Sequence, residues 1–256
     1  MIKTAFIANG ALITSAALAA WAVRGRSSTL LGPVTWHGPR AGPRAGPGAG
    51  PGDLRAIALT FDDGPSESTP RLLDLLDEHQ AQATFFVCGQ NVKRLPGVAR
   101  EIVARGHEIA NHTHSHAALY FKNRDFIRRE VVAAQHQIAD TTGVTPRLFR
   151  PPFGCRWPGL AGILQHQNLR LMMWSVIARD WRLTADQVAS RLEAAASSGA
   201  IFCLHDGRIL QANPDISATI GAVRVMMPRL GESGFRFPTV SQLICPTSFP
   251  TPSSNA

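Results

Sequence analysis

Short apolar segments alternate with amphipathic helical segments from Asp53 onward. Arg55–Phe61, Ala83–Cys88 and Ala200–Leu204 are apolar runs of strand length, and such runs separated by helical patterns are typical of a parallel sheet. Further strands are expected at 108–110, 169–176 and 235–237. One helix is expected to begin at Thr69, and others are expected at 97–105, 124–142, 184–199 and near 216–232. The pattern predicts an α/β fold, a distorted (β/α) barrel with about seven parallel strands.

Polar residues directly follow several of these strands. Asp62 and Asp63 come after the first strand, and Arg150, Asp180 and His205 follow later apolar segments. The C-terminal ends of barrel strands meet at one rim, which is where barrel enzymes carry their active sites. We therefore expect these side chains to line one site.

A histidine pair adds a candidate metal site. His112 and His116 are four residues apart, so on one helical turn both imidazoles would face the same way. Two such ligands and a carboxylate from elsewhere leave room for water, which is the arrangement of a catalytic zinc. His114, between them, is expected to face elsewhere.

The basic charge is concentrated in the N-terminal part of the chain. Residues 1–52 contain five Lys or Arg and no acidic residue, which is +5 of the net +8. The rest of the chain has 21 basic and 18 acidic residues, or +3. This balance gives little support to nucleic-acid binding by the folded part and favours attraction of the N-terminal part to anionic lipid head groups.

Residues 4–23 form an uncharged, mostly apolar run preceded by Lys3 and followed by Arg24 and Arg26. Its length suits a membrane-spanning helix of about 20 residues. Residues 17–19 and 20–22 each also offer a small-x-small signal-peptidase site. Residues 1–26 are thus either a retained anchor or a cleaved signal peptide, and the charge on the C-terminal side would favour a cytoplasmic domain if the segment is retained.

Composition divides the remainder into three parts. Residues 27–52 are rich in Gly and Pro and are predicted to form an extended linker. Residues 53–245 are the predicted domain, and the Pro/Ser/Thr-rich residues 246–256 a disordered tail. The four cysteines show no zinc-finger spacing, and Cys88 and Cys203 stand in apolar runs as small buried residues would. No required disulfide is expected.

Five segments together resemble the motifs of the polysaccharide deacetylase family, the NodB-homology domain of carbohydrate esterase family 4. The resemblance covers residues 53 to about 245. The segments are Thr60–Ser66, His112–His116, Arg150–Gly154, Asp180-Trp181 and Leu204–Gly207. The chain departs from the family in having Phe153 where Tyr is frequent, and Ile177 where many relatives have an acidic residue.

The resemblance implies a role for each reacting group. Asp63, His112 and His116 would hold a divalent metal, Zn²⁺ first and Co²⁺ second. Asp62 would be the general base, and Arg150 would keep it ionised and oriented. His205 would be the general acid, paired with Asp180.

The resemblance also implies the substrate contacts. The backbone N–H of Phe153 would stabilise the oxyanion, an interaction that does not need the Tyr hydroxyl. Trp181 and Leu204 would contact the acetyl methyl group.

The implied activity is metal-dependent removal of N-acetyl groups from N-acetylhexosamine units of a polysaccharide, either peptidoglycan or a chitin-like oligosaccharide. Two alternatives use the same site: an O-acetyl esterase acting on xylan-type polymers, or a hydrolase of non-sugar amides. A third, remote alternative is a catalytically inactive glycan-binding module. A cell-wall substrate favours export of the domain, whereas the charge asymmetry favours a cytoplasmic domain. We give the substrate argument more weight. We therefore expect a monomer outside the cytoplasm, held at the cell membrane by the N-terminal segment or secreted after its cleavage.

Overall fold

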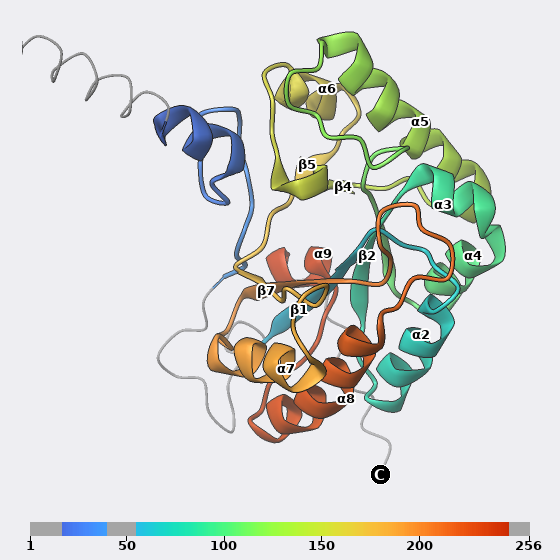
Figure 1. Cartoon of the computed structure of the whole chain (residues 1–256), viewed down its shortest axis with the longest axis vertical. Coiled ribbons are helices and arrows are strands. Elements are labelled where there is room, and N and C mark those ends of the chain that lie inside the picture. The colour runs from blue at the N-terminus through green and yellow to red at the C-terminus, as the bar shows by residue number, and fades with distance from the viewer. Residues whose placement is uncertain (1–16, 40–54, 246–256) are drawn as a thin grey trace, which may run out of the picture.

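Seven parallel strands form one curled sheet in the computed structural model, which describes residues 17–39 and 55–245 (Figure 1). The strands are β1 (Ile57–Asp62), β2 (Ala83–Val87), β3 (Glu108–Asn111), β4 (Leu148–Phe149), β5 (Arg170–Leu171), β6 (Val176–Ile177) and β7 (Ala200–His205). Their order across the sheet is β5-β4-β3-β2-β1-β7-β6. The predicted α/β class and distorted barrel are confirmed.

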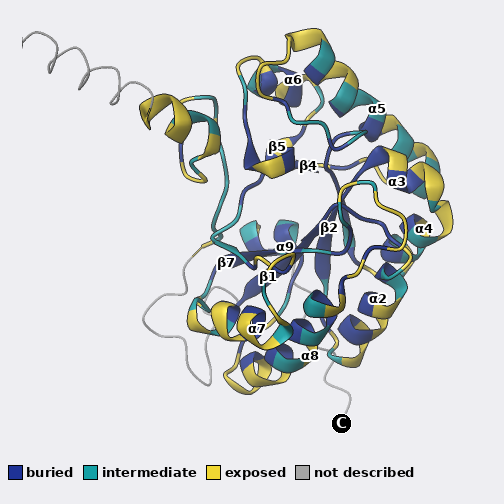
Figure 2. Ribbon diagram, viewed as in Figure 1, coloured by how far each residue is buried: buried dark blue, intermediate teal, exposed yellow. Residues whose placement is uncertain are grey.

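Helices cover the outside of this sheet, except α9 (Val240–Ile244), which packs inside the curl. The others are α2 (Thr69–Glu78), α3 (Gly89–Arg94), α4 (Pro96–Ala104), α5 (Arg124–Thr142), α6 (Leu160–His166), α7 (Ala185–Ala194) and α8 (Ser217–Glu232), with a short 3-10 turn, η1, at Pro152–Gly154. The helix after β6 begins where predicted, because Thr184 and Gln187 form a capping box. Figure 2 shows buried strands and helix faces exposed on the outside.

The two faces of the long strands enter different cores. On β1, Ile57, Leu59 and Phe61 belong to the large cluster that includes residues of α2, α4, α7 and α8. Ala58, between them, belongs to a second cluster inside the curl with residues of α9. Because strand side chains alternate, the inner row of β1 continues from Ala58 through Thr60 to Asp62. The core thus places polar side chains on the inner face at the C-terminal end of the strand.

The predicted strand at 169–176 is wrong as a single element. Its apolar residues form β5 and β6, which lie at opposite ends of the sheet: β5 pairs with β4, and β6 pairs with β7. Residues 172–175 cross the gap between the two ends. An unbroken apolar run does not reveal this break, because the crossing residues Met172 and Met173 are themselves buried.

The predicted last strand at 235–237 is also wrong. Arg236 makes one isolated bridge with Ala56 instead of entering the sheet. Phe235 packs in the large core, so its apolar character is explained by burial without strand pairing.

Part of the predicted linker packs against the barrel. Thr35 forms a parallel bridge with Met172 at the gap between β5 and β6. Its N–H donates to the Leu171 carbonyl at 3.0 Å, and its carbonyl accepts from the Met173 N–H at 2.7 Å. Residues 27–39 are therefore placed by the domain, whereas 40–52 lie outside the described residues, as does the predicted tail at 246–256. The full division of the chain into domains stays a prediction.

The predicted apolar segment at 4–23 is only partly described. Residues 17–24 are helical, and residues 4–16 lie outside the described part. Among the described helices, none has the length and apolar character needed to cross a bilayer.

Candidate active site

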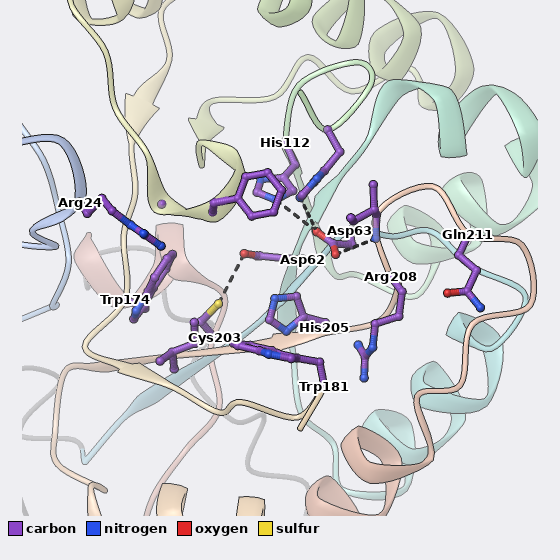
Figure 3. A pocket seen from close by; sticks show the side chains of 15 residues that line it. Arg24, Asp62, Asp63, His112, Trp174, Trp181, Cys203, His205, Arg208 and Gln211 are labelled. Atoms are coloured by element: carbon purple, nitrogen blue, oxygen red, sulfur yellow. Dashed lines mark hydrogen bonds and ion pairs between the residues drawn. The ribbon is translucent and has the colours of Figure 1, made fainter. Parts of the chain in front are cut away.

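A cavity of about 520 Å³ opens at the C-terminal rim of the strands (Figure 3). Seven of the ten predicted site residues line it: Asp62, Asp63, His112, His116, Phe153, Trp181 and His205. Two more lie directly behind it, because the buried Arg150 bonds to Asp62 and the buried Asp180 bonds to His205. The predicted set therefore converges on one place, with the exception of Leu204.

Asp63, His112 and His116 form a compact ligand group. Asp63 Oδ1 lies 2.9 Å from His116 Nε2 and 3.4 Å from His112 Nε2, and the three ligand atoms lie within 4.8 Å of one another. The prediction that the two histidines share a helical turn is wrong. They lie on the loop after β3, where positive φ angles at Thr113 (68°) and His116 (54°) fold the chain back on itself.

The donor set fits a divalent cation. The Nδ1 of His112 lies 2.7 Å from the Arg150 carbonyl, which only a protonated Nδ1 can satisfy. A neutral His112 therefore presents its Nε2 lone pair to the Asp63 carboxylate, and a positive charge between them relieves the repulsion. Burial alone would raise the pKa of Asp63, but hydrogen bonds from protonated His112 and His116, whose charge a bound cation would replace, hold it well below its usual value. Two nitrogens and one ionised oxygen form a three-ligand site of catalytic type.

Arg150 holds the Asp62 carboxylate in one position. One guanidinium nitrogen donates to Asp62 Oδ1 at 2.6 Å and to Thr60 Oγ1 at 2.7 Å, and the other donates to the Met173 carbonyl at 3.1 Å. The guanidinium also lies over the Phe86 ring, 3.9 Å from its centroid. Additional contacts of this kind help a buried charge pair to hold its geometry. Asp62 Oδ2 is the oxygen left toward the cavity.

His205 is held in one orientation by Asp180. Its Nδ1 lies 2.8 Å from Asp180 Oδ1, and its backbone N–H donates to Asp180 Oδ2 at 2.8 Å. Thr219 donates to the same Oδ2 at 2.7 Å. Burial lowers the pKa of His205, but the Asp180 carboxylate more than offsets it and raises the pKa to about 9. The imidazole is thus a cation near neutral pH, with Nε2 left for the cavity.

The two consecutive aspartates reach one cavity because of the backbone at Asp63. Its φ of 73° lies in the left-handed region, which costs a non-glycine residue free energy, and such strained residues cluster at functional sites. Contacts stabilise this conformation: the Ile209 N–H donates to Asp63 Oδ2 at 2.9 Å, and Asn91 donates to the Asp63 carbonyl at 2.7 Å. A regular strand would have turned the two side chains to opposite faces.

Two predicted substrate contacts lie on the cavity wall. Trp181 stands edge-on to His205, with ring centroids 5.0 Å apart, and Phe153 stands edge-on to His116 at 4.8 Å. Both rings are about half exposed, so they can contact a molecule in the cavity.

Leu204 does not lie at the cavity. It belongs to the large outer core, because alternation along β7 turns Leu204 away and places Cys203 and His205 on the inner face. Cys203 lines the cavity, with its sulfur 3.4 Å from Asp62 Oδ2. It was expected as a small buried residue, and strand parity counted back from His205 is the signal that could have placed it here.

Of the other cavity residues that were not predicted, three have large side chains that could contact a ligand. They are Arg24, Trp174 and Arg208. Trp174 lies in the segment that crosses the gap between β5 and β6, and Arg24 lies before the predicted linker. Neither position follows from strand periodicity, because contacts between distant parts of the chain create both.

Three comparisons place the chain among known proteins. The family model described as polysaccharide deacetylase matches residues 49–172. A peptidoglycan-N-acetylglucosamine deacetylase of Bacillus cereus is 34% identical over 218 residues, covering 83% of this chain and 93% of the relative. A chitooligosaccharide deacetylase of Bradyrhizobium is 36% identical over 198 residues, covering 74% of this chain and 90% of the relative.

A solved structure shows the same fold. The crystal structure of a peptidoglycan N-acetylglucosamine deacetylase in complex with 4-naphthalen-1-yl-N-oxidanyl-benzamide matches with a TM-score of 0.74 and 28% identity, covering 83% of this chain and 92% of the other. Sequence, fold and the convergence of the predicted residues agree. This chain belongs to the polysaccharide deacetylase family.

Proposed function

We propose that this protein removes N-acetyl groups from N-acetylhexosamine units of a polysaccharide, either peptidoglycan or a chitin-like oligosaccharide. The observation that carries the proposal is the arrangement of Asp62 and His205. They are register partners on adjacent strands, and they line the same cavity as Asp63, His112 and His116. A candidate base and a candidate acid thus flank a candidate cation site, which suits hydrolysis of an amide.

Asp63, His112 and His116 would hold the cation, Zn²⁺ first and Co²⁺ second. When bound, such a cation supplies a Lewis acid and lowers the pKa of water. Asp62 is the base that takes the proton of the attacking water, and Oδ2 is the accepting atom because Arg150 occupies Oδ1. The guanidinium keeps the carboxylate in one orientation throughout.

His205 is the acid that protonates the departing sugar nitrogen. Its raised pKa, caused by Asp180 against the opposing effect of burial, keeps the proton on the imidazole until the C–N bond breaks. Since Asp180 also accepts the backbone N–H of His205, it fixes the position of the ring as well as its charge.

The acetyl group would lie between the aromatic walls. Trp181 would contact its methyl group, and the backbone N–H of Phe153 would donate to the developing oxyanion. Leu204 faces the outer core, so its proposed methyl contact falls to Trp181.

Acetate release by the purified full-length chain tests the proposal. Chitooligosaccharides and peptidoglycan are the substrates, with Zn²⁺, Co²⁺ or a chelator, and an O-acetylated xylan is the comparison. Release from the N-acetylated glycans that a chelator abolishes supports the proposal. Release only from xylan would identify an esterase, and cation and glycan binding without release from either would identify a binding module.

The location proposal follows from the substrate. A cell-wall glycan lies outside the membrane, so we place the domain outside the cytoplasm, with residues 4–23 as a retained anchor or a cleaved signal peptide. The test is a C-terminal fusion to a reporter of a type that works only in the cytoplasm. Activity of that reporter would overturn this placement.

A further inference from the structure

The segment before the predicted linker forms part of the cavity wall. The carbonyl of Val23 accepts from the Arg156 N–H at 3.0 Å, and the buried Arg156 guanidinium donates to the Gly25 and Ser28 carbonyls. Farther along, Thr35 is tied into the gap between β5 and β6. Residues 23–35 are therefore held at both ends, and a side chain between these ties has a defined place.

Arg24 directs its side chain to the cavity. It lines the same space as Asp62, His205 and Trp174, and in Figure 3 it approaches from the side of Trp174, across the cavity from Arg208. The guanidinium of its neighbour Arg26 instead donates to the Ser175 carbonyl and lies over the Trp36 ring. Of the two arginines, only Arg24 faces the cavity.

Arg24 has no carboxylate partner among the described residues. The ion pairs there involve other cations, and the two acidic groups in the cavity are taken: Asp62 pairs with Arg150, and Asp63 with the histidines. Arg208, a half-buried cation at the cavity, donates to the Gly207 and Asp180 carbonyls. Within residues 17–39 and 55–245, no hydrogen bond or ion pair takes up the Arg24 guanidinium, so its donors face the cavity for a ligand.

A neutral N-acetylhexosamine polymer offers no anion to this group. A planar guanidinium matches a carboxylate through two parallel hydrogen bonds. Arg24 lies on the Trp174 side of the cavity (Figure 3), a position that suits a substituent on a neighbouring sugar better than the scissile acetamide. We propose that Arg24 is a specificity-determining residue that binds the carboxylate of an acidic sugar next to the N-acetyl group removed. The preferred substrates are then acidic N-acetylated glycans, such as those that carry lactyl carboxylates, over neutral ones. This inference rests on the proposed deacetylase function.

The test measures kcat/KM of the full chain on three oligosaccharides of equal length. One is neutral, one carries lactyl carboxylates on alternate sugars, and the third has those carboxylates methylated. The wild type prefers the acidic oligosaccharide over both others. Arg24→Gln lowers the ratio of acidic to neutral kcat/KM by about three- to tenfold, as expected for a partly exposed charged pair, and Arg24→Lys keeps part of the preference. The preference also shrinks with added salt, since screening lengths fall to about 10 Å at 0.1 M.

Arg128→Gln is the matched control for net charge, because Arg128 lies on α5 with an exposed side chain. It leaves the ratio as in the wild type. If Arg24→Gln loses kcat/KM equally on the acidic and neutral substrates, the proposal is overturned. It is also overturned if the ratio of acidic to neutral kcat/KM is unchanged and the variant binds anionic phospholipid vesicles more weakly, which would assign Arg24 to the membrane.

A binding measurement separates this inference from the function on which it rests. Calorimetry with the acidic oligosaccharide compares wild type with Arg24→Gln and needs no turnover. Binding that weakens with Arg24→Gln supports the site even if acetate is never released. Equal binding, together with normal deacetylation of both glycans, removes Arg24 and leaves the deacetylase intact.

Discussion

The two sides of the curled sheet are built differently. On one side, β1, β2 and β7 are five or six residues long and almost entirely buried, and they pair in continuous register. On the other, β4, β5 and β6 have two residues each, and residues 23–35 complete the wall. Asp62 and His205 end long strands, whereas Arg24 and Trp174 belong to the side with short strands. The proposed base and acid thus end long strands, whereas Arg150 and Asp180, which orient them, follow the short strands β4 and β6.

The largest expected effect on activity is for a substitution on the side with the long strands. Asp62→Asn removes the base without changing its size, so kcat falls by about 10³-fold or more while cation affinity is kept. Acetate release and calorimetric titration with Zn²⁺ measure the two quantities. Asp74→Asn, at an exposed position on α2, is the control. Substantial turnover by the Asp62 variant would remove the base from the mechanism.

Loss of a ligand should be nearly as severe. His112→Ala leaves two of three ligands, and cation affinity should fall by roughly 100-fold or more, with activity following it. His114→Ala is the matched control, because His114 lies on the same loop but outside the ligand group. Equal cation affinities for the two variants would refute the assignment of His112.

Asp180→Asn should change the pH dependence more than the maximal rate. The acid works protonated, and its pKa of about 9 predicts activity that is present below pH 9 and lost as the pH rises through it. Without the carboxylate, the pKa of His205 falls, so the basic limb of kcat/KM moves to lower pH by about one unit or more. A pH profile from 6 to 10 checks this. A limb that stays in place would assign it to another group.

The smallest effect on activity is expected for a substitution on the side with the short strands. Arg156→Met removes the bonds to the Gly25 and Ser28 carbonyls and should destabilise the protein by about 1–3 kcal/mol. Amide exchange should increase over residues 23–38 but not in β1 or β7, and KM should rise more than kcat falls. Exchange that increases equally everywhere would contradict the separation of the two sides.

The same contrast decides what the sequence could predict. Long buried strands are recognisable from their apolar runs: every residue of β1 is buried, and all of them before Asp62 except Thr60 are apolar. The reacting residues were found because they directly follow such strands and resemble the family motifs. The parts that were missed depend on long-range contacts. Thr35 meets Met172 across the gap, and nothing in the composition of either segment signals that pairing.

Local periodicity failed where the backbone leaves regular conformations. His112 and His116 are four residues apart, but positive φ angles in a loop bring them together instead of a helical turn. The resemblance implies a methyl contact for Leu204, but alternation along β7 turns this side chain into the outer core. In both cases, the direction of a side chain follows from its place in the chain only when the secondary structure is known.

The register between Asp62 and His205 has a consequence for how this fold can diversify. Neighbouring strands are about 4.8 Å apart, so the backbone ladder itself sets the spacing of proton acceptor and proton donor. Insertions, deletions or exchanges in the surrounding loops leave that spacing untouched. Loop changes can therefore alter glycan specificity during evolution while the spacing of the proton acceptor and the proton donor is kept.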